Sequence, residues 1–91
     1  MSFCDDVREP ADPRPTTLGD FTRALAAVEA VLRQNEPQHR GAWRHEPPYS
    51  HAAHCRAHCE IWQAERRLED LAHAAVRVLM ALELALREGT A

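Results

Sequence analysis

The sequence predicts an all-α protein, a small three-helix domain whose second and third helices form an antiparallel hairpin. Hydrophobic residues make up 45% of the 91 residues and aromatic residues only 5%. Most of the apolar content is therefore alanine and leucine, which favour helices over strands. These residues recur at steps of three and four, the spacing of one helix face. A chain of this length forms one domain with a small core, so a homodimer is expected.

Residues 1–16 are expected to form a flexible tail, because three prolines stand among charged residues there. The single helical domain then covers residues 17–89. Thr16 or Thr17 can cap a first helix over about residues 18–35. The apolar stripe of this helix consists of Leu18, Phe21, Leu25, Val28 and Leu32.

Pro37 is expected to end the first helix, since the residue before a proline disfavours the helical conformation. Residues 36–49 would form a long loop whose tryptophan, arginines and histidines suggest packing or function. Ser50 can cap a second helix from His51 to about Glu65. A third helix is expected from about Leu68 to Arg87, with Gly89 just beyond its end. Its apolar stripe consists of Leu68, Ala72, Ala75, Leu79, Leu82 and Leu86.

The connection between the second and third helices carries neither glycine nor proline. Helix propensity alone would allow one unbroken helix, in which His58 and Asp70 would lie about 18 Å apart. Polar residues on both sides of this segment can share a site only if the chain reverses. We therefore predict a turn near residues 63–67.

Four polar residues on these two helices form the strongest candidate for a functional site. His54 and His58 are four residues apart and Asp70 and His73 three apart, so each pair lies on one helix face. Imidazoles with a carboxylate suit zinc, manganese or iron. We expect the four side chains to hold a divalent metal, although a polar face exposed to solvent is the competing interpretation.

Three neighbours could alter this site. His51 lies on the same face, seven residues before His58, and could be a fourth ligand or could support the ligands. Cys55 and Cys59 could form a thiolate-rich zinc site with a histidine, but more often such cysteines fill a core. Their spacing and the odd total of three cysteines argue against disulfides and favour a reducing compartment.

Arg77 lies one helical turn after His73 and could hold a phosphate, or instead pair with Glu69, Asp70 or Glu83. Arg44 and Trp43 in the loop could also bind a nucleotide, Arg44 by holding a phosphate and the Trp43 indole by stacking on a base. Core packing is the alternative for Trp43 and the preferred role for Trp62.

Charge and motifs exclude several classes of function. The net charge of −3 gives no basic excess, so binding to duplex nucleic acid is not expected. The sequence contains no signal peptide and no apolar run that could span a membrane, so we expect a cytoplasmic protein without a membrane partner. Glycine-rich phosphate loops and nucleophile motifs are also missing.

Several blocks resemble a phage-encoded family of small helical proteins described as dATP/dGTP diphosphohydrolase N-terminal-like. The resemblance covers residues 18–87, without the glycine that the family usually has between its histidine and Asp-x2-His blocks. The blocks are Trp43-Arg44, Tyr49, His51-x2-His54-x3-His58, Glu69-Asp70-Leu71-Ala72-His73-Ala74 and Arg77-x2-Met80-Ala81-Leu82-Glu83. The resemblance implies a helical fold and a role in phage nucleotide metabolism, in the cytoplasm of a bacterial host.

The sequence thus favours a metalloprotein that binds or hydrolyses a purine nucleotide. In a hydrolase the metal would activate water, with Glu69 or His51 as the base and Arg77 and Arg44 steadying the phosphates. One alternative is a non-catalytic interaction protein, such as a phage inhibitor or a nucleotide sponge, with structural metal or none. Another is a long-helix dimer without a small-molecule site.

Overall fold

The computed structural model describes residues 13–88, and within this range it contains helices and no strand. Two short 3-10 helices, η2 (Leu18–Phe21) and η3 (Ala42–His45), accompany three α-helices: α1 (Thr22–His39), α2 (Pro48–Glu65) and α3 (Leu68–Arg87). The predicted all-α fold with three helices is confirmed. Most of the predicted tail, together with Gly89, lies outside the described residues.

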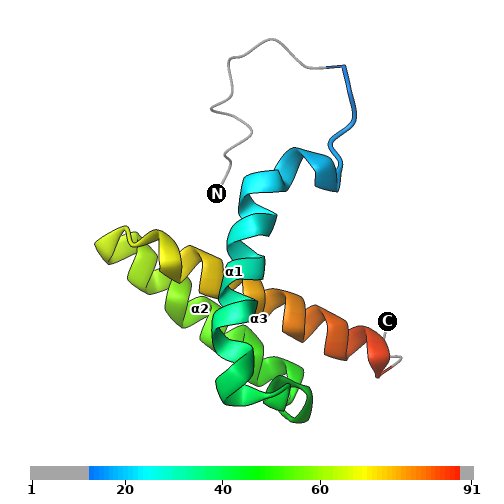
Figure 1. Ribbon diagram of the computed structural model, residues 1–91, viewed down its shortest axis with the longest axis vertical. Helices are drawn as coiled ribbons and strands as arrows, with labels where there is room; N and C mark the ends of the chain where they lie inside the picture. The colour runs from blue at the N-terminus through cyan, green and yellow to red at the C-terminus, as the bar shows by residue number, and fades with distance from the viewer. Residues whose placement is uncertain (1–12, 89–91) are drawn as a thin grey trace.

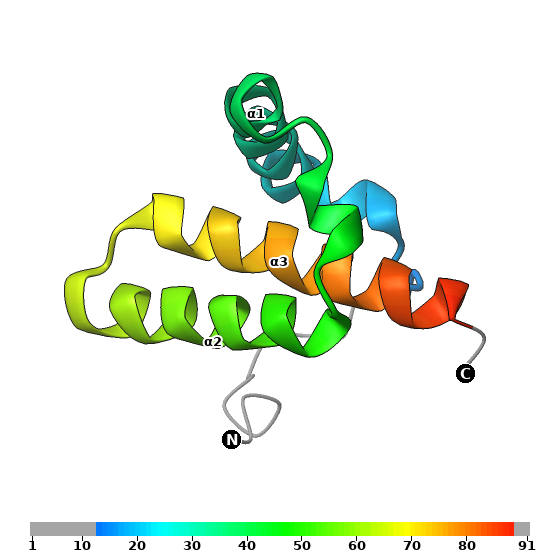
Figure 2. The ribbon, with the colours of Figure 1, turned by 90° about the horizontal axis from the view of Figure 1, so that it is seen from below.

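Helices α2 and α3 form the predicted antiparallel hairpin and lie side by side along their length (Figure 2). The chain reverses at Arg66, which has left-handed dihedrals (φ 59°, ψ 31°) that glycine usually adopts at the end of a helix. Its N–H donates to the carbonyl of Trp62 at 2.7 Å. Its guanidinium lies 4.5 Å from the centre of the Trp62 ring. The predicted turn is therefore confirmed, and the single long helix is excluded.

The end of α1 differs from the prediction. The helix continues through Pro37 to His39, because a proline in the last turn removes only one backbone hydrogen bond. The left-handed Arg40 then closes the helix, with its N–H donating to the carbonyl of Glu36 at 2.7 Å. At the other end, Thr17 caps η2 and shares a capping box with Asp20.

The predicted loop over residues 36–49 is also wrong in part, because most of it is helical. Helix α2 begins at Pro48 and not after Ser50, since a proline suits the first position of a helix, where its missing N–H needs no partner. The Ser50 hydroxyl donates to the Glu46 carboxylate at 3.0 Å and caps nothing.

Helix α1 crosses α3 on the side opposite α2, so the molecule has three layers (Figures 1 and 2). Val28 and Val31 of α1 pack on Val76 of α3, with small or flexible side chains of α3 around them. Residues 18–27, which precede this crossing, include no buried side chain. None of the described helices is long and apolar enough to cross a membrane.

Candidate functional site

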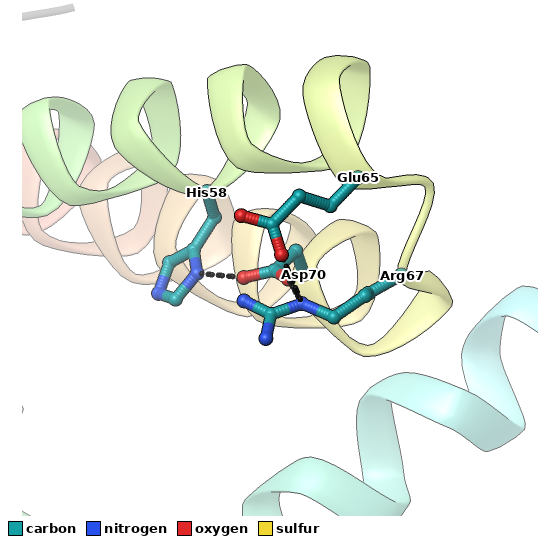
Figure 3. Close-up of polar contacts among 4 residues, drawn as sticks. All are labelled: His58, Glu65, Arg67 and Asp70. Atoms are coloured by element: carbon teal, nitrogen blue, oxygen red, sulfur yellow. Dashed lines mark hydrogen bonds and ion pairs between the residues drawn. The ribbon is translucent and has the colours of Figure 1, made fainter.

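His58 of α2 and Asp70 of α3 meet across the hairpin (Figure 3). The two atoms that join them are His58 Nδ1 and Asp70 Oδ1, 2.9 Å apart. An ionised carboxylate only accepts hydrogen bonds, so Nδ1–H donates, and in the neutral form of the ring the lone pair is then on Nε2. The carboxylate therefore fixes both the ring orientation and the tautomer of His58.

The Asp70 carboxyl group is buried, with a side chain only 6% exposed, and both of its oxygens have partners. Arg67 Nε donates to Oδ2 at 2.9 Å and also lies 3.6 Å from Glu65. The hydrogen bond from His58 is the main reason why the pKa of Asp70 is lowered, and Arg67 adds to this against the opposing effect of burial. Asp70 is therefore held as a carboxylate.

His73 stacks on His58, with ring centres 5.1 Å apart and planes 23° from parallel. The structure thus brings together three of the four predicted metal ligands. His54 is exposed one turn before His58 on α2 and does not join them. Within residues 13–88, no three His, Cys, Asp or Glu side chains are arranged to hold a metal ion.

His51 is fully buried and ties three segments together. Its Nε2 lies 2.9 Å from the Trp43 carbonyl of η3, and its Nδ1 lies 2.8 Å from the Arg77 guanidinium of α3. A carbonyl only accepts and a guanidinium only donates, so Nε2 carries the proton and Nδ1 accepts. Both ring nitrogens are engaged, and His51 therefore has no nitrogen left to act as a catalytic base in this arrangement.

Arg77 has a different acidic neighbour from the three that the sequence suggested. Its NH1 nitrogen lies 3.6 Å from the Glu46 carboxylate, in addition to contacting His51. The pKa of Glu46 is lowered, chiefly by the hydrogen bond from Ser50, while partial burial opposes the shift. The short segment between η3 and α2 thus supplies an acidic partner to α3.

A hollow of about 360 Å³ opens beside this network, between the end of α1, η3 and the hairpin. His58, His73 and Arg77 are among the polar side chains that line it. Its remaining lining comes from Leu32, Asn35, Glu36, His39, Gly41, Ala42, Trp43, Glu46, Val76 and Met80. A second and more apolar hollow of about 550 Å³ shares five lining residues with it: Leu32, Glu36, Trp43, Val76 and Met80.

The other predicted site residues line the hollows or lie at the surface. Trp43 is half-buried, with the guanidiniums of Arg44 and Arg87 5.1 Å and 5.6 Å from its ring centre. Arg44 lines the apolar hollow, whereas Glu69 is exposed in the first turn of α3. Trp62 is half-buried beneath Arg66 and so belongs to the turn.

Glu36, His39 and Glu46 line the polar hollow and were not singled out from the sequence. The unusual density of histidine, arginine and tryptophan over residues 36–49 was the signal for them. Cys55 and Cys59 are half-buried free thiols, and burial raises the pKa of Cys55. A raised pKa disfavours the thiolate form that binds metals.

Comparison of the chain with protein-family models, curated proteins and solved structures yields no match.

Proposed function

We propose that this protein is a small helical metalloprotein that binds a purine nucleotide. His58 and His73 would hold a zinc, manganese or iron ion, and Arg77 would contact the phosphates. One observation carries the proposal: the Asp70 carboxylate fixes His58 so that Nε2 keeps its lone pair, while His58, His73 and Arg77 line one hollow.

Asp70 would have the role that carboxylates commonly have behind a metal-binding histidine, where they orient the ring and raise its basicity. Because Asp70 already binds His58 and Arg67, the protein would supply two imidazoles and few other ligands. The remaining coordination positions would go to water or to phosphate oxygens of the ligand. Metal and nucleotide are therefore expected to bind together, each increasing the affinity for the other.

The two connected hollows support a nucleotide as the ligand. The polar one offers imidazoles and a guanidinium, which suit a metal and phosphates. The apolar one offers Trp43, Val76, Leu79 and Met80, which suit a base. The choice of a purine, and of phage nucleotide metabolism, rests on the sequence resemblance to the dATP/dGTP diphosphohydrolase N-terminal-like family.

Binding is favoured over hydrolysis by the positions of the two candidate bases. His51 has both ring nitrogens engaged and is fully buried, and Glu69 is exposed at the start of α3. A hydrolase would therefore depend on the metal and on other groups of the polar hollow to activate water. Assays for release of phosphate or diphosphate from dATP and dGTP, with each metal added, separate the two activities.

The decisive experiment is calorimetric titration with a non-hydrolysable dATP or dGTP analogue, with and without manganese or zinc. The wild type should bind the nucleotide tightly only with metal. The double variant His58→Ala/His73→Ala should lose this metal dependence, and Arg77→Ala should weaken binding about tenfold or more, as expected for a charge-assisted contact. Arg56→Ala, on the exposed face of α2, is the matched control and should bind normally. Equal nucleotide affinity in all four proteins would exclude the site.

A non-catalytic interaction protein is the second candidate, and the exposed leucines of α3 favour it. Leu79, Leu82 and Leu86 are each about half exposed. In that case the metal would be structural or absent, and the nucleotide titrations would show no binding.

A further inference from the structure

The apolar stripe of α3 points away from α2. The side of α3 that meets α2 carries Asp70 and Arg77, which contact His58 and His51. The stripe on the other side contains no charged residue, and five of its large side chains are between 36% and 55% exposed. We call this stripe the seat: Leu71, Val78, Leu79, Leu82 and Leu86. Leu71, Val78, Leu82 and Leu86 follow one another at steps of seven and four, and Leu79 lies three residues before Leu82, so the five occupy adjoining parts of one face.

A second uncovered apolar surface lies at the start of the folded chain. Residues 18–27, which we call the arm, comprise η2 and the first part of α1 and include no buried residue. Leu18, Phe21 and Leu25 continue the stripe that Val28 begins to bury, and they are 74%, 48% and 42% exposed. The arm thus presents a helix face with the pattern of a core-facing surface.

The arm cannot cover the seat of its own chain along its length. Helix α1 is continuous from Thr22, and Val28 and Val31 fix it across α3. The arm therefore projects past α3 and does not lie along it (Figure 1).

We propose that a second copy of this chain covers both surfaces, with the arm of each copy lying along the seat of its partner. The exchange is reciprocal, so one two-fold axis satisfies both apolar surfaces of both chains. No other occupant is required, because the chain itself carries a matching helix face for each surface. A contiguous exposed apolar surface of this kind marks a protein interface.

The size of the two surfaces agrees with a dimer. Fully burying a large apolar side chain removes roughly 60–120 Å² from water. Eight side chains that are about half exposed therefore offer roughly 250–500 Å² of apolar area per copy. A standard interface of about 800 Å² per partner contains roughly 450–500 Å² of apolar area. The apolar area of the arm and seat approaches this value even without the area that alanines and the aliphatic parts of polar side chains would add.

The dimer would leave the polar hollow accessible, and the seat shares only Leu79 with the lining of the apolar hollow. The residues of α3 that line the polar hollow include His73, Arg77 and Met80, none of which belongs to the seat. The hollow is also bounded by the last turns of α1, whereas the arm is its first part. Leu25 and Leu82 lie outside the lining of both hollows, so variants at these two positions test oligomerisation separately from nucleotide binding.

The test is the mass of the full chain in solution, by light scattering and sedimentation. The wild type should have twice the 10.3 kDa of one chain. Leu25→Arg in the arm and Leu82→Glu in the seat should each give monomers that stay helical by circular dichroism. Tyr49→Glu, at an exposed position outside both surfaces, is the matched control and should remain dimeric.

Mixing the two monomeric variants distinguishes arm exchange from other dimers. The mixed dimer has one unaltered arm on an unaltered seat, and an arginine facing a glutamate in the other contact. A dimer should therefore re-form on mixing, while neither variant dimerises alone. A monomeric wild type, a Leu82→Glu variant that stays dimeric, failure to re-form on mixing, or binding to lipid vesicles in place of self-association would each overturn the proposal. If either variant unfolds, Leu25→Gln and Leu82→Gln replace the pair.

Discussion

His58 and Asp70 are twelve residues apart in sequence and joined at 2.9 Å across the hairpin, through Nδ1 and Oδ1. This contact links α2 to α3 near the turn, and Arg67 binds the other oxygen of the same carboxylate. A buried carboxylate is stabilising only while both of these partners are present. The contact is therefore both a structural link and the element that orients His58.

Asp70→Asn is expected to lower the melting temperature at neutral pH, because the amide places donors against Arg67 or His58. The pKa of Asp70 is below its ordinary value of 3.8, so this carboxylate stabilises the fold above about pH 4. That contribution is lost as the pH falls through the lower folded-state pKa. The variant should therefore lose less stability than the wild type between pH 4 and pH 2, as measured by thermal unfolding.

Glu60→Gln is the control for this measurement, since Glu60 pairs with Arg56 on an exposed helix face. It should leave both the melting temperature and its pH dependence close to those of the wild type. An Asp70→Asn variant with an unchanged acid profile would show that the carboxylate does not stabilise the hairpin.

Arg77→Ala is expected to reduce the free energy of unfolding by about 1–3 kcal/mol, because buried His51 Nδ1 loses its donor. Glu46→Gln should cost less than about 1 kcal/mol, since its contact with Arg77 is partly exposed. Urea denaturation of both variants checks this order. An equal loss of stability in the two variants would indicate that Arg77 stabilises the fold through its ion pair with Glu46 and not through its contact with His51.

Zinc or manganese is expected to raise the melting temperature at pH 7 and much less at pH 5. Imidazole must be neutral to bind a metal, and pH 5 lies below the ordinary histidine pKa of about 6.5. The His58→Ala/His73→Ala variant should lose the increase, and His54→Ala should keep it because His54 is exposed and apart. A full response in the double variant would place the metal elsewhere, with Cys55 and Cys59 as the first residues to test.

Arg66 offers a test of the turn. Arg66→Ala removes the contact with the Trp62 ring but keeps a Cβ in a left-handed conformation. Arg66→Gly removes the same contact and also relieves the left-handed strain. The glycine variant should therefore be more stable than the alanine variant, by up to about 1 kcal/mol. Equal stability would mean that the turn carries no strain.

The helices could be predicted because their signals are local. The stripe from Leu68 to Leu86 has the helical period throughout, and α3 has the predicted bounds. The turn could be predicted only from the spacing of the polar pairs. The residue in the left-handed conformation is an arginine, whereas a glycine at this position would have indicated a turn in the sequence. The end of α1 was missed because a proline near the last turn costs one hydrogen bond and does not always stop a helix.

The site was predictable only in part. Helix periodicity places His58, Asp70 and His73 on facing surfaces, and the structure brings them together. Periodicity cannot reveal that Arg67 occupies the second Asp70 oxygen, or that His51 turns towards Trp43 and Arg77. Those contacts depend on the rotation of α2 about its axis and on the path of residues 40–47, which no local pattern specifies.

The short separation between His58 and Asp70 has a consequence for the order in which the protein assembles. Contacts within the hairpin close small loops, whereas Val28 and Val76 must close one of nearly fifty residues. The hairpin is therefore expected to form first, bringing His58, Asp70 and His73 together before α1 docks. The contacts that orient His58 would then exist in the nascent chain, and the docking of α1 would complete the lining of the polar hollow.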